Sequence, residues 1–221
     1  MAQTKGVYNV SGDKWIIGFG FMRDNELLEY IDNKLTHGKP ITVTADYSCL
    51  DKEQQPDMDT IWGWSGKGII KLEGTEAMVK EFDKASPNVR EKLEEQYLRL
   101  DKLKPLPGTP GALFNRALFN QAPFNQGPTH PTTRDGKDVH YYFSEFRRLM
   151  FPKGFQCEND SHDVMHISIH YLFTRDIFLT RNIRHFAEDR LQQRFEDLAI
   201  LTPHKFVNLF NRVLSSIKRQ G

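Results

Sequence analysis

Short apolar runs alternate with helical patterns along the chain. The β-branched segment 41–45 (ITVTA) predicts a buried strand, and segment 68–72 (GIIKL) predicts a second one. A third strand is expected at 177–180 (IFLT) and a short edge strand at 199–203 (AILTP). Polar residues follow the first and third of these strands directly. This succession is typical of an open α/β fold, in which ligands bind at the carboxyl ends of strands.

Helical periodicity fills the segments between the strands. An apolar stripe at positions 27, 28, 31 and 35 predicts a helix that Gly38 and Pro40 end. Another helix is expected after Thr75, which suits the N-cap position. Segment 164–173 alternates as a strand does, but its length before a polar turn favours a helix. Further helices are expected at 88–103, 141–150, 187–195 and 204–218.

Two segments lie outside this regular pattern. A predicted strand at 15–22 and the helix after it form an N-terminal extension, residues 1–40, before a domain at 41–221. Segment 104–138 is rich in Pro and Gly and repeats a Phe-Asn pair three times at a spacing of five. A loop this long inside a domain is typically functional or disordered. We expect it to dock on the domain, on a second subunit or over the active site.

Composition narrows the class of protein. The net charge is +1, so the chain gives no overall basic signal for nucleic acid, although a basic groove on one face stays open. Sixteen Phe favour a packed core. Cys49 and Cys157 lie far apart and are expected to be reduced, buried thiols. No segment has the length of a signal peptide or a membrane span, so a cytoplasmic protein without membrane contact is expected.

Acidic and amide side chains follow the predicted strands or sit on the helices after them. Asp46 comes directly after the first strand, with Ser48 two residues on, an arrangement suited to a hydrated divalent cation. Glu81 lies on the helix after the second strand, and Asp163 near the start of the helix at 164–173. Asn182 closes the polar tip of the third strand. The plain alternatives are a turn residue for Asp46 and a solvated charge for Glu81.

Three histidines at positions 162, 166 and 170 would share one helix face. Residues His162 to His166 resemble the His-Glu-x-x-His zinc motif with Asp in place of Glu, so a zinc hydrolase using His162, His166 and His170 stays open. Aspartate is shorter than the usual general base, and no distant third ligand stands out. Half-buried histidines that hydrogen-bond to neighbours are the more common case.

Taken together, the acidic motifs resemble those of the PIN-domain nuclease family. Asp46-Tyr47-Ser48-Cys49-Leu50 is similar to the first motif, 79–82 (VKEF) to the second and 163–167 (DVMHI) to the third. Segment 176–182 (DIFLTRN) is similar to the fourth, and 200–206 (ILTPHKF) to the final strand and helix entry. The segment before residue 41, the long insertion and Ile-Ser-Ile-His in place of small alanines depart from the family.

The resemblance implies a three-layer α/β/α domain with a central, mainly parallel sheet. It implies an endoribonuclease that hydrolyses RNA with Mg²⁺ or Mn²⁺, as in toxin–antitoxin or RNA-processing proteins, and it leaves room for an inhibitory protein partner and a homodimer. The carboxylates that meet at the metal would have raised pKa values in its absence. The site residues it implies are the catalytic and metal-binding Asp46, Glu81 and Asp163, the metal-site Asn182, and the supporting Ser48 and Thr180.

A non-enzymatic alternative also stays open. In it, the chain is a PIN-like scaffold that binds a protein partner through the Phe-rich segment 104–138 and leaves RNA intact.

Overall fold

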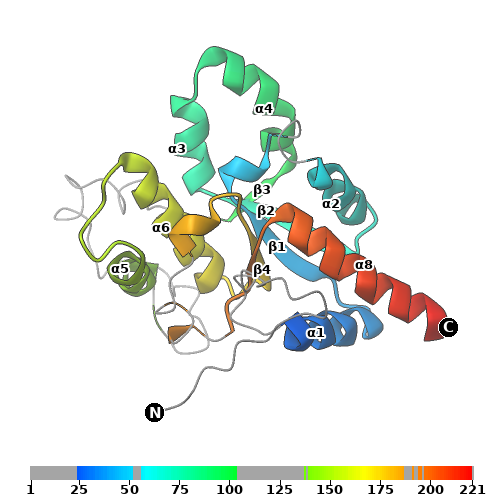
Figure 1. Cartoon of the computed structure of the whole chain (residues 1–221). Helices are drawn as coiled ribbons and strands as arrows, with labels where there is room; N and C mark the ends of the chain where they lie inside the picture. Colours follow the sequence, from blue (N-terminus) through cyan, green and yellow to red (C-terminus); the bar gives the residue numbers. More distant parts are fainter. Residues whose placement is uncertain are drawn as a thin grey trace, which may run out of the picture.

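Five parallel strands form one central sheet with helices on both of its faces (Figure 1). The computed structural model describes residues 24–51, 56–103, 137, 139–186, 191, 194–195 and 197–220. The predicted strand at 15–22, the insertion at 104–138 except for Lys137, and most of the helix expected at 187–195 lie outside these residues. The α/β class and the three-layer arrangement expected from the sequence are confirmed.

The strands follow the order β3-β2-β1-β4-β5 across the sheet. Four of them confirm the sequence predictions, and β1 has the predicted bounds. The strand β3 was not predicted, since it was included in the helix expected at 88–103. Leu100 has an extended backbone (φ −85°, ψ 130°) and ends that helix before the three-residue strand begins. The strands are β1 Ile41–Ala45, β2 Ile70–Thr75, β3 Asp101–Leu103, β4 Ile177–Leu179 and β5 Ile200–Leu201.

The helices confirm most of the predicted helical segments, with shifted ends. Gly38, at φ 66°, adopts the left-handed conformation that ends the first helix as expected. No helix in the described part of the chain is long and apolar enough to cross a membrane. The helices are α1 Asp24–Thr36, α2 Asp57–Gly66, α3 Ala77–Lys84, α4 Pro87–Arg99, α5 Val139–Met150, α6 Glu158–Leu172 and α8 Pro203–Gln220, with 3₁₀ turns η1 Tyr47–Cys49 and η2 Ile183–Phe186.

The face of the sheet toward α1, α2 and α8 is apolar. Alternation along β1 directs Ile41, Val43 and Ala45 into this layer, where all three are fully buried. Trp64 of α2 packs its ring against Phe206 of α8 at a centroid distance of 5.9 Å. Trp62 and Trp64 of α2 both belong to this core. Because α1 contributes buried residues to the same core, it is joined to the sheet by packing; a domain boundary at residue 40 stays a prediction.

The opposite face carries α5 and α6 and is more polar. Phe178 of β4 joins an aromatic and aliphatic cluster from these helices. Thr44 of β1 and Glu73 of β2, which are paired in register, are also buried. This polar layer beneath α6 leads toward the carboxyl ends of the strands.

Three local expectations need correction. The helix expected at 164–173 begins earlier, because Cys157 and Asp160 form a reciprocal capping box at its start. Thr75 does not cap α3; it is the last residue of β2 and is fully buried. Cys49 is buried as expected, but Cys157 is exposed because it lies at this helix start.

Candidate active site at the carboxyl ends of β1 and β4

The strand order creates one switch point in the sheet, between β1 and β4. From β1 the chain moves outward through β2 to β3, and then returns to β4 and β5 on the other side. Ligands of open α/β proteins bind in the crevice outside the strand ends at such a point. Ala45 is paired with Leu179, so the residues that follow them, Asp46 and Thr180, emerge side by side.

Asp46 is buried at this switch point and held by hydroxyl groups. The relative solvent exposure of Asp46 is only 3%. The Ser48 hydroxyl donates to Oδ1 at 2.5 Å, and the Thr180 hydroxyl donates to Oδ2. Burial raises the pKa of Asp46; His166 and the two hydroxyls oppose the rise, and the charge of Glu81 adds to it. Ser48 and Thr180, to which the resemblance assigned supporting roles, are thus both hydrogen-bonded to Asp46.

Asp163 approaches from α6. It lies in the second turn of the helix, whereas the sequence placed it at the helix start. Its Oδ2 accepts a hydrogen bond from Nδ2 of Asn182 at 3.0 Å and is also bonded to Nδ1 of His185. Burial raises the pKa of Asp163 to about 6, with His185 opposing and the negative charge of Asp46 adding to the rise.

The loop after β4 is fixed to both aspartates. Thr180 Oγ1, which donates to Asp46, accepts a hydrogen bond from the backbone N–H of Asn182 at 2.9 Å. Phe186 anchors the other end of the loop, with its buried ring 5.5 Å from that of Phe178. The loop therefore holds the Asn182 amide beside Asp163.

Glu81 of α3 reaches the same region and meets His166. Its Oε2 lies 2.6 Å from Nε2 of His166, and Nδ1 of that ring lies 2.6 Å from Oγ1 of Thr75. Burial lowers the pKa of His166, but the charges of Glu81, Asp46 and Asp163 outweigh it and raise that pKa overall. The imidazole of His166 is thus the common neighbour of the three expected carboxylates.

The carboxylates act on one another but do not form a ready metal cage. Glu81 raises the pKa of Asp46, and Asp46 raises that of Asp163. Among the described residues, however, no three His, Cys, Asp or Glu side chains are grouped closely enough to hold an ion. Two carboxylates completed by waters are a common protein ligand set for Mg²⁺. Asp46 and Asp163 fit such a set, since their partners leave acceptor capacity on both.

The three histidines of α6 do not meet at one point. Burial lowers the pKa of His162, whose Nδ1 lies 3.8 Å from Oε1 of Glu81 without a hydrogen bond. Burial also lowers the pKa of His170 to about 3, and its ring lies against Phe178. His166 uses both ring nitrogens in hydrogen bonds. All three are fully buried rather than half-buried, because α6 lies between the sheet and α5.

Two site residues, Thr75 and His185, were missed by the sequence reasoning. Thr75 is the last residue of β2, and Asp46 and Thr180 come directly after β1 and β4. A hydroxyl residue at the carboxyl end of a predicted strand could therefore have indicated that Thr75 lies near the site. His185 lies three residues after Asn182, on η2, and only the fold brings it to Asp163.

No family model, curated protein or solved structure matches the chain.

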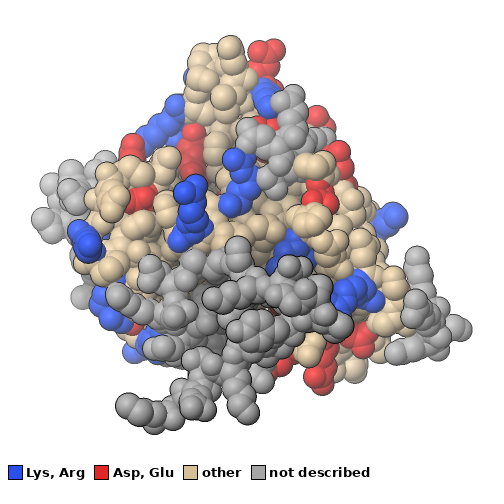
Figure 2. Space-filling model, in the orientation of Figure 1, with Lys and Arg blue, Asp and Glu red and all other residues tan. Residues whose placement is uncertain are grey.

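Basic side chains border the site even though the whole chain is nearly neutral. Figure 2 shows Lys and Arg side chains over the region where α3, α6 and η2 come together, with a few acidic ones among them. Lys80 and Lys84 lie on α3, and Arg184 lies on η2. Arg90 of α4 is near enough to Tyr47 to lower its pKa against the larger, raising effect of burial.

Proposed function

We propose that the chain is a metal-dependent endoribonuclease that hydrolyses phosphodiester bonds of RNA at the Asp46–Asp163 site. The observation that carries the proposal is the pair of buried aspartates with raised pKa values at the switch point of a parallel sheet. Carboxylates gathered against their own repulsion are typical of functional sites. The cofactor proposed is Mg²⁺ or Mn²⁺, for which oxygen ligands are suited.

The chemistry that a bound divalent cation supplies is activation of water and neutralisation of charge on the phosphate. The chain's own residues hold the site in shape. Ser48 and Thr180 fix both oxygens of Asp46, and Asn182 fixes Oδ2 of Asp163. The contact between Asp163 Oδ2 and His185 Nδ1 provides a place where a proton can be held close to the scissile bond.

The basic side chains around the site favour an anionic polymer as substrate. Lys and Arg beside an acidic site attract the phosphates that flank the bond to be cut. Near the candidate site, Lys80 and Lys84 lie on α3 and Arg184 lies on η2, although the net charge of the whole chain is only +1. A toxin or RNA-processing role, an inhibitory protein partner, a homodimer and a cytoplasmic location remain predictions from the sequence.

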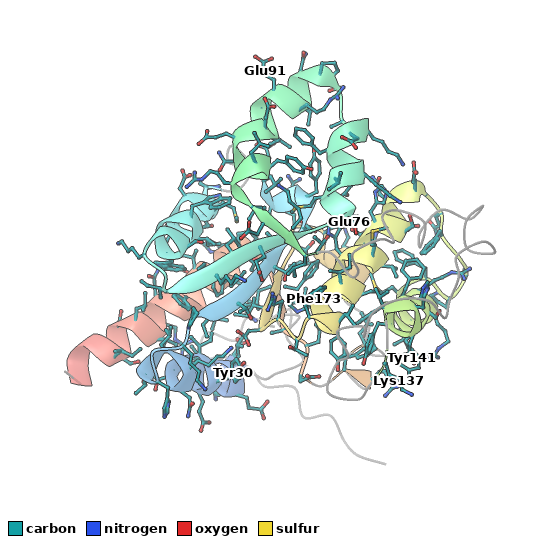
Figure 3. The ribbon with its side chains drawn as sticks, turned by 180° about the vertical axis from the view of Figure 1, so that it is seen from behind. Tyr30, Glu76, Glu91, Lys137, Tyr141 and Phe173 are labelled. Carbon is teal, nitrogen blue, oxygen red and sulfur yellow. The ribbon has the colours of Figure 1, made fainter. Side chains whose placement is uncertain are left out.

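The test is cleavage of single-stranded RNA by the full chain in MgCl₂ or MnCl₂, with EDTA as the metal-free control. Asp46→Asn and Asp163→Asn keep the shape of each side chain and should lower the cleavage rate at least about 100-fold. Glu91→Gln is the matched control: Glu91 is exposed near the outer tip of α4, far from the sheet in Figure 3. This variant should cut like the parent protein.

Two results would contradict the proposal. If both aspartate variants cut as fast as the parent, the assigned site is wrong. If the parent leaves RNA intact and calorimetry detects no binding of Mn²⁺, the non-enzymatic scaffold is the better account.

A further inference from the structure

A hydrogen-bonded chain across three elements holds the side chain of Glu81. Nε2 of His166, on α6, lies 2.6 Å from Oε2 of Glu81, on α3. Nδ1 of the same ring lies 2.6 Å from Oγ1 of Thr75, at the end of β2. Both ring nitrogens are therefore engaged, and neither is free to bind a cation.

Thr75 and His166, the two buried residues of this hydrogen-bonded series, are held firmly in place. Thr75 is fully buried and His166 is 1% exposed. Thr75 is paired with Leu103 in the β2–β3 register, so the sheet fixes its backbone. The residues on either side of His166 along α6, Met165 and Ile167, lie in the hydrophobic core. The position of the Glu81 carboxylate is consequently set by the sheet and by α6, and not by α3 alone.

The second oxygen of Glu81 is left open toward a ligand. The side chain of Glu81 is 17% exposed. Within the described residues, Glu81 is hydrogen-bonded through Oε2, and Oε1 lies 3.8 Å from Nδ1 of His162 without bonding to it. That nitrogen is buried and lacks a hydrogen-bond partner. Buried polar atoms without partners are uncommon in proteins, so Nδ1 of His162 marks a place where a polar group can bind beside Oε1 of Glu81.

The hydrogen bonds from Thr75 through His166 to Glu81 also keep Glu81 from bonding with the two aspartates. Oε2 is committed to His166, and the imidazole stands as the shared neighbour of Glu81, Asp46 and Asp163. In keeping with this, the described part of the chain holds no group of three side chains placed to bind one ion. Asp46 and Asp163 are joined through Thr180 and Asn182, whereas Glu81 is bonded to His166 and, through that ring, linked to Thr75.

We propose that Thr75 and His166 are positioning residues that hold Glu81 beside the Asp46–Asp163 pair, so that a divalent cation here is bound by two carboxylates and not three. Oε1 of Glu81 then accepts a hydrogen bond from the attacking water. This inference rests on the proposed function for the identity of the ligand. It departs from the three-carboxylate ligand set that the sequence resemblance implied.

The ligand set is tested by titrating Mn²⁺ into the full chain by calorimetry. Asp163→Asn should weaken binding at least about tenfold, whereas Glu81→Gln should change the dissociation constant less than about threefold. If Glu81→Gln weakens Mn²⁺ binding as much as Asp163→Asn does, Glu81 is a ligand and the inference is wrong.

The positioning role is tested by cleavage kinetics with Thr75→Val, which keeps the side-chain shape and removes the hydroxyl. We expect kcat to fall about tenfold with KM nearly unchanged, because substrate binding is untouched. In a Glu81→Gln background the same substitution should change nothing, and Thr75→Ser should restore the rate. Equal losses in both backgrounds, or no restoration by serine, would show that Thr75 acts on the fold and not through Glu81.

A measurement in EDTA keeps this inference separate from the proposed function. In the ¹⁵N NMR spectrum of the metal-free chain, Thr75→Val should shift the Nδ1 resonance of His166, and Glu81→Gln should shift its Nε2 resonance. If neither resonance moves, the hydrogen-bonded chain does not exist in solution. If both move but the parent neither binds Mn²⁺ nor cuts RNA, the positioning of Glu81 stands and the nuclease proposal fails.

Discussion

Two aspartates with nearly inaccessible side chains lie at opposite ends of the same pair of strands and differ in what surrounds them. Asp46 follows β1 at its carboxyl end, and Asp176 precedes β4 at the amino ends, where it contacts Thr42 of β1. Each accepts a hydrogen bond from a threonine hydroxyl, Thr180 for Asp46 and Thr42 for Asp176. Both side chains are nearly inaccessible to solvent, at 3% for the residue Asp46 and 5% for the Asp176 side chain.

The pKa values of the two aspartates shift in opposite directions because their hydrogen-bond and ion-pair partners other than the threonines differ. Nζ of Lys34 lies 2.6 Å from Oδ2 of Asp176, and the Tyr30 hydroxyl and the Thr42 backbone N–H also donate to this carboxylate. Burial acts to raise the pKa of Asp176, but these donors prevail and lower it. No lysine or arginine in the described residues forms an ion pair with Asp46, and its pKa is raised. A carboxylate satisfied by the protein is structural, whereas one left short of positive charge is prepared for a ligand.

The largest stability effect is expected at the amino end of the strands. Asp176→Asn removes the charge that Lys34 faces and should lower the free energy of unfolding by about 3 kcal/mol, as when one partner of a buried ion pair is lost. Urea denaturation at neutral pH measures it. An unchanged stability would mean that α1 is not fastened to the sheet through Asp176.

The same substitution at Asp163 should have the opposite sign. Its pKa of about 6 lies roughly two units above that of a free aspartate, so its charge opposes folding at neutral pH. In EDTA, Asp163→Asn should raise the free energy of unfolding by about 1–3 kcal/mol, with the lost His185 contact reducing the gain. A destabilised Asp163→Asn protein would show that the His185 and Asn182 contacts outweigh the charge.

The pH dependence sharpens this prediction. Between about pH 4 and pH 6 the native state binds more protons at Asp163 than the unfolded chain does, so this group's contribution lowers stability as pH rises. The advantage of Asp163→Asn over the parent should therefore be full above about pH 6 and should disappear near pH 4. Urea midpoints of both proteins across this range measure it, and a difference independent of pH would contradict the assignment.

The smallest effect is expected for the exposed control Glu91→Gln. An isolated surface charge contributes little, so this variant should unfold within about 0.5 kcal/mol of the parent at any pH in this range. A larger change, measured in the same urea series, would mean that removing any carboxylate alters stability and that the Asp176–Asp163 contrast is not local.

Sequence patterns predicted the fold better than the site. β-Branched residues and the polar break after Ala45 were enough to bound β1, because burial on both faces demands an apolar run. The strand β3 was missed because its three residues, two of them charged, continue a charged helix without a break in pattern. The start of α6 was missed because Cys157 is an unusual capping residue.

Some of the residues that the resemblance grouped are brought together by neighbouring strands. Asp46 and Thr180 are 134 residues apart in sequence, yet they are hydrogen-bonded because each follows one of two paired parallel strands. The contact of Thr75 with His166, 91 residues away, depends on how α6 crosses the sheet. No local pattern encodes that crossing, so the engagement of Glu81 by His166 could not be foreseen.

The most direct test of the central claim compares urea unfolding of the parent and Asp163→Asn in EDTA and in excess MnCl₂. We expect the variant to be the more stable protein in EDTA, and Mn²⁺ to stabilise the parent more than the variant, since the gain in stability grows with the affinity of the native state for the ion. If Asp163→Asn is less stable in EDTA and Mn²⁺ affects both proteins equally, the carboxyl-end aspartates are structural, as Asp176 is, and the account is wrong.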